Sequence, residues 1–337
     1  MSCGACHLKG VAPAKQAESG RVLWTRDRKP GEPSPIHQMS LEGTGDESCR
    51  RCHTAGNRVG AAAMVLPAKS LICMPCHTAT FSVGDTTTIL GLAVFLAGVV
   101  LFLAPALTAS RGEPGSGPLA KLLLLVGDGI KAVFSKRIFH IIEVLFLDVL
   151  LQRRLYHRSR GRWAIHGLIF YPFVLRFVWG LAALIFSAQG VESGWIWKMV
   201  DKNHPLTAFF FDVTGIILII GVALAYARGA GRKDSGIPGV PGQDRLGLGL
   251  IAAMALMGFL LEGMRIAMTG SPAGSAYAFL GYAISRIFAG RPSIVDFYGY
   301  FWYAHAILTG VFIAYLPFSR LFHIIIAPWV LASRDEH

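Results

Sequence analysis

The sequence has few charged residues and no cysteine outside three short motifs. Charged residues make up 15% of the 337 residues, hydrophobic residues make up 53%, and the mean hydropathy is +0.50. This composition excludes an ordinary soluble domain, in which about a quarter of the residues are charged. Acidic residues are scarce, 20 against 32 Lys and Arg, so the net charge is +12. Because the basic residues gather in loops between apolar runs, this charge indicates membrane topology and a docking face for a partner, not nucleic-acid binding.

All six cysteines lie in three copies of Cys-x-x-Cys-His, which is the spacing for covalent haem attachment. The two thiols add to the haem vinyl groups, and the adjacent imidazole then binds the iron. A zinc site does not need a His directly after every second Cys, and a thioredoxin-like dithiol is a single motif near a βαβ pattern, which is missing here. The sequence therefore predicts three c-type haems. Their ligands are Cys3, Cys6 and His7, then Cys49, Cys52 and His53, then Cys73, Cys76 and His77.

The other axial ligands of these haems must come from few residues. Before the first apolar run, His37 is the one His outside the motifs, so it cannot serve three irons. We expect His37 to be one distal ligand, the alternative being a surface loop histidine. Met64 is a second candidate, since a thioether ligand raises haem potential, although a Met in an apolar run also suits packing. Met74 lies inside its own motif and is discounted.

Five apolar runs are each long enough to cross a bilayer, which takes about 20 residues. They begin at Thr86, Ala164, Leu206, Leu246 and Phe297. Residues 1–85 are polar and contain Gly and Pro, so this segment is expected to fold around its haems. The predicted architecture is all-α, with a small, loop-rich trihaem cytochrome c domain over 1–85. A five-helix transmembrane haem b bundle follows over 86–337.

The basic residues predict the orientation of these spans. Ten Lys and Arg lie between the first two apolar runs, which indicates the cytoplasmic side of a bacterial or archaeal membrane. The N-terminus is then periplasmic, where c-type haem is attached, and the C-terminus is cytoplasmic. No signal peptide precedes Cys3, so the start lies upstream, a leader has been removed, or the first span exports the domain.

Within the basic loop, residues from about 132 to 156 have apolar side chains at helical spacing with charges between them. This pattern predicts an amphipathic helix on the cytoplasmic surface, which could dock a soluble iron–sulfur subunit. His140 and His157, in and beside this helix, are interpreted as solvated or partner-facing side chains.

Three further histidines lie in or beside the apolar runs, where an ionisable group is costly and usually functional. His166 is near the inner end of the second span, His305 is in the outer half of the fifth, and His323 is just past its inner end. His305 and His323 are 18 residues apart. On a continuous helix they share one face and lie about 27 Å apart, which suits two haems at different depths.

The stretch "FYGYFWYAHAILTGVFIAYLPFSRLFHIIIAPW" resembles the last span of the respiratory nitrate reductase gamma subunit, a five-helix dihaem cytochrome b. The resemblance covers about 86–334. The segment "RWAIHGLIF" and the basic loop are similar to the cytochrome b subunits of sulfite-reductase-associated and heterodisulfide-reductase-type membrane complexes.

The resemblance implies two haems b. His166 and His323 ligate the inner one, and His305 ligates the outer one. The family's second ligand of the outer haem falls on Arg176. That haem is therefore five-coordinate, or bound by His204, or absent; we favour a haem on His305 with an open or substituted sixth position. Arg176 then meets a haem propionate or packs between helices.

The fourth span carries Glu262 and Arg265 at i, i+3 near its outer end. A quinol loses two protons as its electrons leave, so this pair is a candidate catalytic element, the alternative being a structural ion pair. Asp212 and Lys202 are further candidates. The resemblance also implies quinol oxidation beside the outer haem.

These observations predict a membrane cytochrome bc subunit that moves electrons between a quinone such as menaquinone, periplasmic c haems and a cytoplasmic iron–sulfur partner. A periplasmic cytochrome c or another redox protein would be the outer partner. The alternative is a pure transmembrane electron conduit and anchor without a quinone site of its own.

Overall fold

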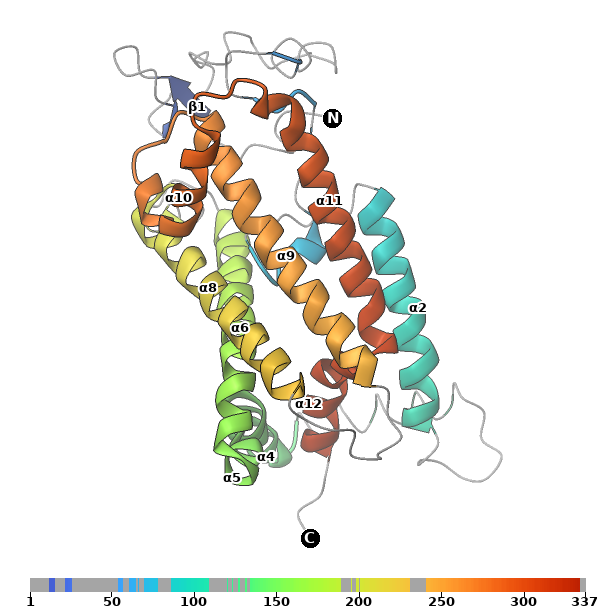
Figure 1. The fold of residues 1–337 in the computed structure, drawn as a ribbon. Coiled ribbons are helices and arrows are strands. Elements are labelled where there is room, and N and C mark those ends of the chain that lie inside the picture. The colour runs from blue at the N-terminus through green and yellow to red at the C-terminus, as the bar shows by residue number, and fades with distance from the viewer. Residues whose placement is uncertain are drawn as a thin grey trace. The chain divides into compact units, whose positions relative to one another are not determined.

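The computed structural model describes residues 12–15, 22–25, 54–56, 61–64, 66, 70–77, 86–108, 120, 123, 127, 131, 134–188, 195, 198–199, 201–230 and 241–333. The first two haem-attachment motifs and His37 lie outside these ranges. Two short strands, β1 (Ala12–Lys15) and β2 (Val22–Thr25), pair antiparallel with Ala12 opposite Thr25 (Figure 1).

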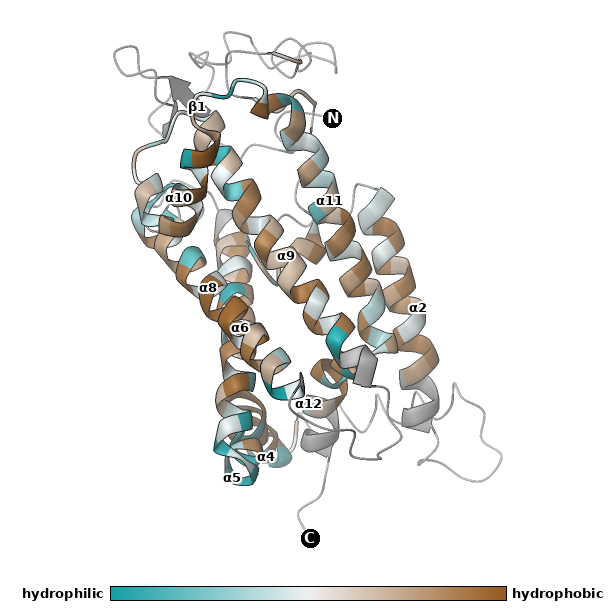
Figure 2. Cartoon of the chain, in the orientation of Figure 1, coloured by the Kyte–Doolittle hydropathy of each residue, from teal (hydrophilic) through white to brown (hydrophobic). Residues whose placement is uncertain are grey.

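Among the described residues, four helices are long and apolar enough to cross a membrane, so the chain is a multi-pass membrane protein. Figure 2 shows hydrophobic residues along most of their length. The first predicted span, which begins at Thr86, forms helix α2 (Thr86–Thr108), of which Thr86–Phe102 counts as a shorter apolar helix. The four long helices are α6 (Arg160–Ala188), α8 (Pro205–Ala230), α9 (Pro241–Met268) and α11 (Ile294–Tyr315).

Contacts divide the chain into two compact units, and each long helix contributes to both. The first unit consists of Met1–Ile89, Leu168–Ala223 and Ile251–Gly310, and the second of Leu90–Gly167, Leu224–Leu250 and Val311–His337.

The first unit also contains the short elements η2 (Leu71–Cys73), η4 (Ser275–Tyr277) and α10 (Phe279–Phe288). Aromatic rings pack between α6 and α8. Trp179 of α6 stacks on Phe210 of α8, with ring centroids 4.5 Å apart.

In the second unit, residues 137–158 form three helical pieces where a single amphipathic helix is predicted over about 132–156. They are α4 (Arg137–Val144), the π-helix η3 (Leu145–Leu150) and α5 (Arg153–Arg158). The break lies at Gln152, whose φ of 57° is left-handed and incompatible with a continuous helix. Figure 2 shows polar residues gathered on α5.

The continuous helical face predicted for His305 and His323 is wrong. After α11 the chain passes through η5 (Leu316–Phe318), an extended Ser319 and η6 (Arg320–Phe322) before α12 (His323–Ser333) begins. The proline in η5 lacks an amide hydrogen, and Ser319 caps η6 by accepting from the Leu321 amide, so the helical register is lost between the two histidines. His323 is therefore placed by the start of α12.

Candidate functional sites in the two units

The second unit brings His166 of α6 and His323 of α12 together. Their ring centroids are 6.1 Å apart. The Nδ1–H of His166 donates to Oε1 of Gln152 at 3.0 Å, and the Nδ1–H of His323 donates to the Arg320 carbonyl at 2.7 Å. Both Nε2 atoms are thereby left as acceptors, which is the state of a metal-ligating imidazole held by an outer partner. The donor set fits a haem bound by two histidines, as expected for the inner site.

Gln152, which sequence reasoning missed, lies one helical turn after a buried acidic residue of the adjoining π-helix. This residue, Asp148, is 7% exposed and accepts from Arg153 Nε at 2.9 Å and from Arg154 Nε at 3.0 Å. The hydrogen bond from Arg153 holds the pKa of the Asp148 carboxyl below its usual value. These bonds fix the chain on either side of Gln152 and direct its amide towards His166. The sequence signal for this arrangement is the pair of arginines after Gln152, which does not identify their partner.

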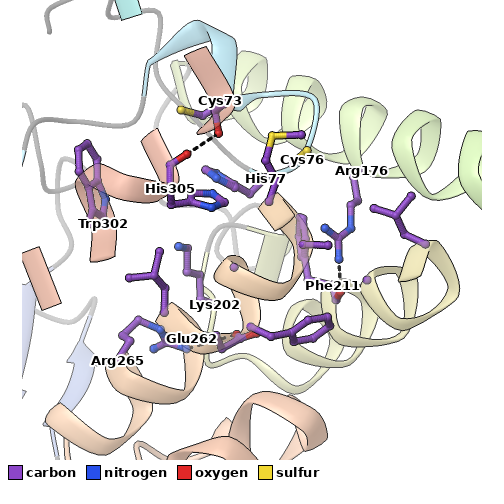
Figure 3. A pocket seen from close by; sticks show the side chains of 18 of the residues that line it. Cys73, Cys76, His77, Arg176, Lys202, Phe211, Glu262, Arg265, Trp302 and His305 are labelled. Carbon is purple, nitrogen blue, oxygen red and sulfur yellow. Dashed lines mark hydrogen bonds and ion pairs between the residues drawn. The ribbon is translucent and has the colours of Figure 1, made fainter. Parts of the chain in front are cut away.

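The first unit contains a cavity lined by the third haem-attachment motif and by α6, α8, α9 and α11. Cys73, Cys76 and His77 lie along it together with His305. Figure 3 shows the rings of His77 and His305 beside each other, with Glu262 and Arg265 of α9 on the other side of the cavity. The structure therefore groups side chains that the sequence assigns to three different sites: the third haem c, the outer haem b and the quinol site. Further lining residues that sequence reasoning missed are Tyr298 and Trp302.

The third motif packs directly on α6. Met74, between the two cysteines, is 3% exposed and forms a hydrophobic cluster with Leu184. A Cβ atom at Gly180 would lie 3.2 Å from the Met74 carbonyl oxygen and 3.3 Å from that of His77, so a glycine permits this close approach. Burial raises the pKa of the Cys76 thiol to about 11, so the thiol stays protonated at neutral pH.

The rings of His77 and His305 have centroids 6.4 Å apart, with an angle of 26° between their planes. His77 is the last residue of its motif, and its amide donates to the Cys73 carbonyl at 3.2 Å in a tight turn. His305 lies on α11, on the side that faces the cavity. Two imidazoles therefore meet at the position for which the sequence predicts one outer-haem ligand.

Arg176 lines the same cavity and is anchored to α8. Its Nε donates to Thr214 Oγ1 at 2.8 Å, one of its terminal nitrogens donates to the Phe211 carbonyl, and its guanidinium lies 5.4 Å from the centroid of the Phe211 ring. These contacts hold the cation against the cavity wall. Arg176 thus fits both expected roles, since it joins two helices and can still offer charge to an anionic group.

Glu262 and Arg265 form the expected i, i+3 ion pair, with 3.6 Å between Glu262 Oε1 and an Arg265 nitrogen. Arg265 also donates to Asn203 Oδ1 at 2.8 Å. The carboxylate lies against α10, because a Cβ atom at Gly281 would come within 3.2 Å of Glu262 Oε2. The acid is therefore fixed in place at the cavity rather than swinging freely.

For three other candidates, Asp212, His204 and Met64, the structure shows a capping or packing contact. Asp212 is fully buried and accepts from the Leu280 and Gly281 amides at 2.8 and 3.4 Å, so it caps the N-terminus of α10. His204 Nδ1 accepts from the Leu206 amide at the start of α8.

Met64 packs its sulfur against Gly299 of α11. Lys202, the remaining candidate, lines the cavity as proposed from the sequence.

The comparisons with known proteins agree with a membrane redox subunit. The chain is 26% identical over 260 residues to the E subunit of dihydromethanophenazine:CoB–CoM heterodisulfide reductase from Methanosarcina thermophila, covering 72% of this chain and 88% of that one. It is 28% identical over 202 residues to the corresponding subunit from Methanosarcina barkeri, covering 57% of this chain and 66% of the relative.

A further relative is the EtfAB:quinone oxidoreductase of Syntrophomonas wolfei, which is 25% identical over 202 residues, or 56% of this chain and 27% of that protein. No family model and no solved structure matches the chain.

Proposed function

We propose that this protein is the membrane subunit of a respiratory complex and carries electrons between a quinol, periplasmic c haems and a cytoplasmic iron–sulfur partner. The observation that carries the proposal is the cavity of the first unit. It combines a haem-attachment motif and His305 with a fixed carboxylate, Glu262, and the cation of Arg265.

The two histidine pairs provide the places for electron carriers. In the second unit, His166 and His323 would hold the inner haem b, with Gln152 and the Arg320 carbonyl fixing their rings. In the first unit, His305 would hold the outer haem. A bound haem supplies reversible one-electron chemistry at iron. The protein residues set the ring orientations, the charge nearby and the access of water.

Glu262 is the proposed acceptor of a quinol proton. Quinol oxidation releases two protons, and a general base must lie within hydrogen-bond reach of the hydroxyl that it deprotonates. The ion pair with Arg265 and the contact with Gly281 keep the carboxylate oriented at the cavity. Arg265 is in turn held by Asn203, so the pair is positioned before any substrate arrives.

Charge and the relatives support the proposed orientation and partners. The basic loop that contains Arg153 and Arg154 favours a cytoplasmic second unit and a periplasmic N-terminus. Relatives named as heterodisulfide reductase subunits support a complex with other reductase subunits. The partner we propose is an iron–sulfur subunit on the cytoplasmic side. A relative named as a quinone oxidoreductase supports a quinone such as menaquinone as the membrane substrate.

The test is the rate at which a reduced menaquinone analogue reduces the haems of the purified protein. The Glu262→Gln variant keeps the size of the side chain but loses the base, so the rate is expected to fall about 100-fold or more while haem content stays unchanged. The matched control is Glu143→Gln, which changes a carboxylate whose side chain is 53% exposed on α4. A wild-type rate in Glu262→Gln would favour the alternative, an electron conduit without a quinone site.

A further inference from the structure

We infer that the third haem-attachment motif and the outer haem site are one site. A single c-type haem, attached through Cys73 and Cys76, would be ligated by His77 on one side and His305 on the other. The inference rests on the proposed function and deepens it. It replaces two separately expected haems, the third haem c and the outer haem b, by one.

The spacing of the two rings carries the argument. Two imidazoles on opposite sides of one metal, each with a bond of about 2 Å and a ring radius of about 1.1 Å, have centroids about 6 Å apart. His77 and His305 are 6.4 Å apart by this measure. His166 and His323, the expected ligands of the inner haem, are 6.1 Å apart. The two pairs thus have the same spacing, although one arises from two helices and the other from a helix and a motif.

The inference explains why Arg176 stands where the resembled family has its second ligand of the outer haem. The outer haem does not need a ligand from α6, because the motif packed on α6 at Gly180 supplies His77 instead. Position 176 is then available for a residue that binds α8 through Thr214 and faces the cavity.

The cavity has a charge that suits a haem, and one of its walls is open beside His305. Its charged lining residues are three cations, Arg176, Lys202 and Arg265, and one carboxylate, Glu262. This excess of positive charge suits the two propionates of one haem. Helix α9 presents Gly258 next to His305, and a Cβ atom built there would meet only His305 Cε1, at 3.9 Å, so this wall is open.

Attachment needs no additional reactant. Each thiol S–H adds across one vinyl C=C of the haem. A C–S bond forms, the S–H bond and the π bond break, and the thiol hydrogen goes to the terminal vinyl carbon. No electron is gained or lost overall, and nothing leaves.

The first test counts haems in the wild-type protein. A pyridine haemochrome spectrum before and after acid–acetone extraction separates covalent haem c, which stays, from haem b, which is removed. We expect three c to one b, four haems in total. Three c to two b would overturn the inference and leave the proposed function standing. Two c would instead remove the third motif from the proposed relay and overturn the inference with it.

A ratio of three to one also arises if the outer haem is simply lacking, so ligation must be tested separately. In His305→Met, one covalently attached haem should change from two histidine ligands to His and Met, and its midpoint potential should rise. The matched control, His323→Met, should alter only the extractable haem. The inference is overturned if every covalent haem of His305→Met keeps its wild-type spectrum and potential.

A second variant covers the case in which His305→Met does not accumulate. His305→Gly produced with imidazole in the medium should yield one covalent haem that becomes high-spin when imidazole is dialysed away and low-spin when it is restored. An imidazole response confined to the extractable haem, or none at all, would overturn the inference.

Discussion

Replacing Gln152 tests whether the second unit holds its haem through a buried amide. Gln152 is 5% exposed, and its Oε1 accepts from His166 Nδ1 at 3.0 Å. In Gln152→Leu the imidazole N–H is left buried without this acceptor, which costs about 1–3 kcal/mol. Since 1.4 kcal/mol is about a factor of ten, haem b retention should weaken by about 5-fold to 150-fold. Loss of an outer hydrogen-bond partner typically weakens metal sites by about 10–100-fold, which is the same range.

The backbone at this position supplies the control. Gln152 has a φ of 57°, which glycine adopts without strain. Gln152→Gly therefore relieves the backbone while removing the same hydrogen bond, and it should lose haem b as Gln152→Leu does. If Gln152→Gly keeps haem b and Gln152→Leu loses it, the apolar bulk of the leucine and not the loss of the hydrogen bond is the cause.

The assay is transfer of haem b to apomyoglobin, followed by absorbance. Covalently attached haem does not transfer, so the inner site is observed alone if the outer haem is covalent as inferred above. The potential of the inner haem should also rise, because an imidazole without its acceptor donates less electron density. Transfer at the wild-type rate from both variants would refute the role given to Gln152.

Three other changes should have distinct outcomes. Gly180→Val places methyl groups against the third motif and should change the axial ligation of one covalent haem, seen in its spectrum, whereas Gly229→Val, where a Cβ atom meets nothing within 4 Å, should not. Asp148 has a lowered pKa in the folded protein, so its stabilisation is present above about pH 4 and is lost as pH falls further. Asp148→Asn should therefore have a lower melting temperature than the wild type at pH 7, and the two melting temperatures should converge below about pH 4. Asp212→Ala removes the cap of α10 and should lower stability by about 0.5–2 kcal/mol in thermal unfolding with haem content unchanged.

The long helices could be predicted closely because a bilayer fixes their length and composition. The runs predicted from Ala164 and Leu206 correspond to helices that begin at Arg160 and Pro205. The sequence also singles out His166 and His323, since a histidine next to an apolar run is conspicuous, and the structure brings their rings together. Their role as haem ligands stays a prediction. The sequence pattern wrongly placed His305 and His323 on one helical face. Between them, Pro317 lies in η5 and the extended Ser319 caps η6, so the helix is interrupted.

Contacts between residues far apart in the chain could not be predicted from the sequence. Nothing in a periodic pattern shows that Asp212 meets the amides of α10, 68 residues further on, or that the segment around Met74 packs on α6. Such contacts depend on how helices meet, which hydropathy does not encode. Haem binding at all three motifs, the haem b ligands, His37 as a ligand and the domain boundary at residue 85 remain predictions.

The packing of the third motif also sets an order for biogenesis. Met74 is 3% exposed, and the carbonyl oxygens of Met74 and His77 lie against Gly180. An attachment enzyme that must grip the peptide around Cys73 and Cys76 has no access to it once this surface is covered. If this motif binds haem as proposed, haem addition would therefore precede the final packing of the motif on α6. A cell that attaches haem slowly would then accumulate a membrane intermediate in which this segment is not yet packed.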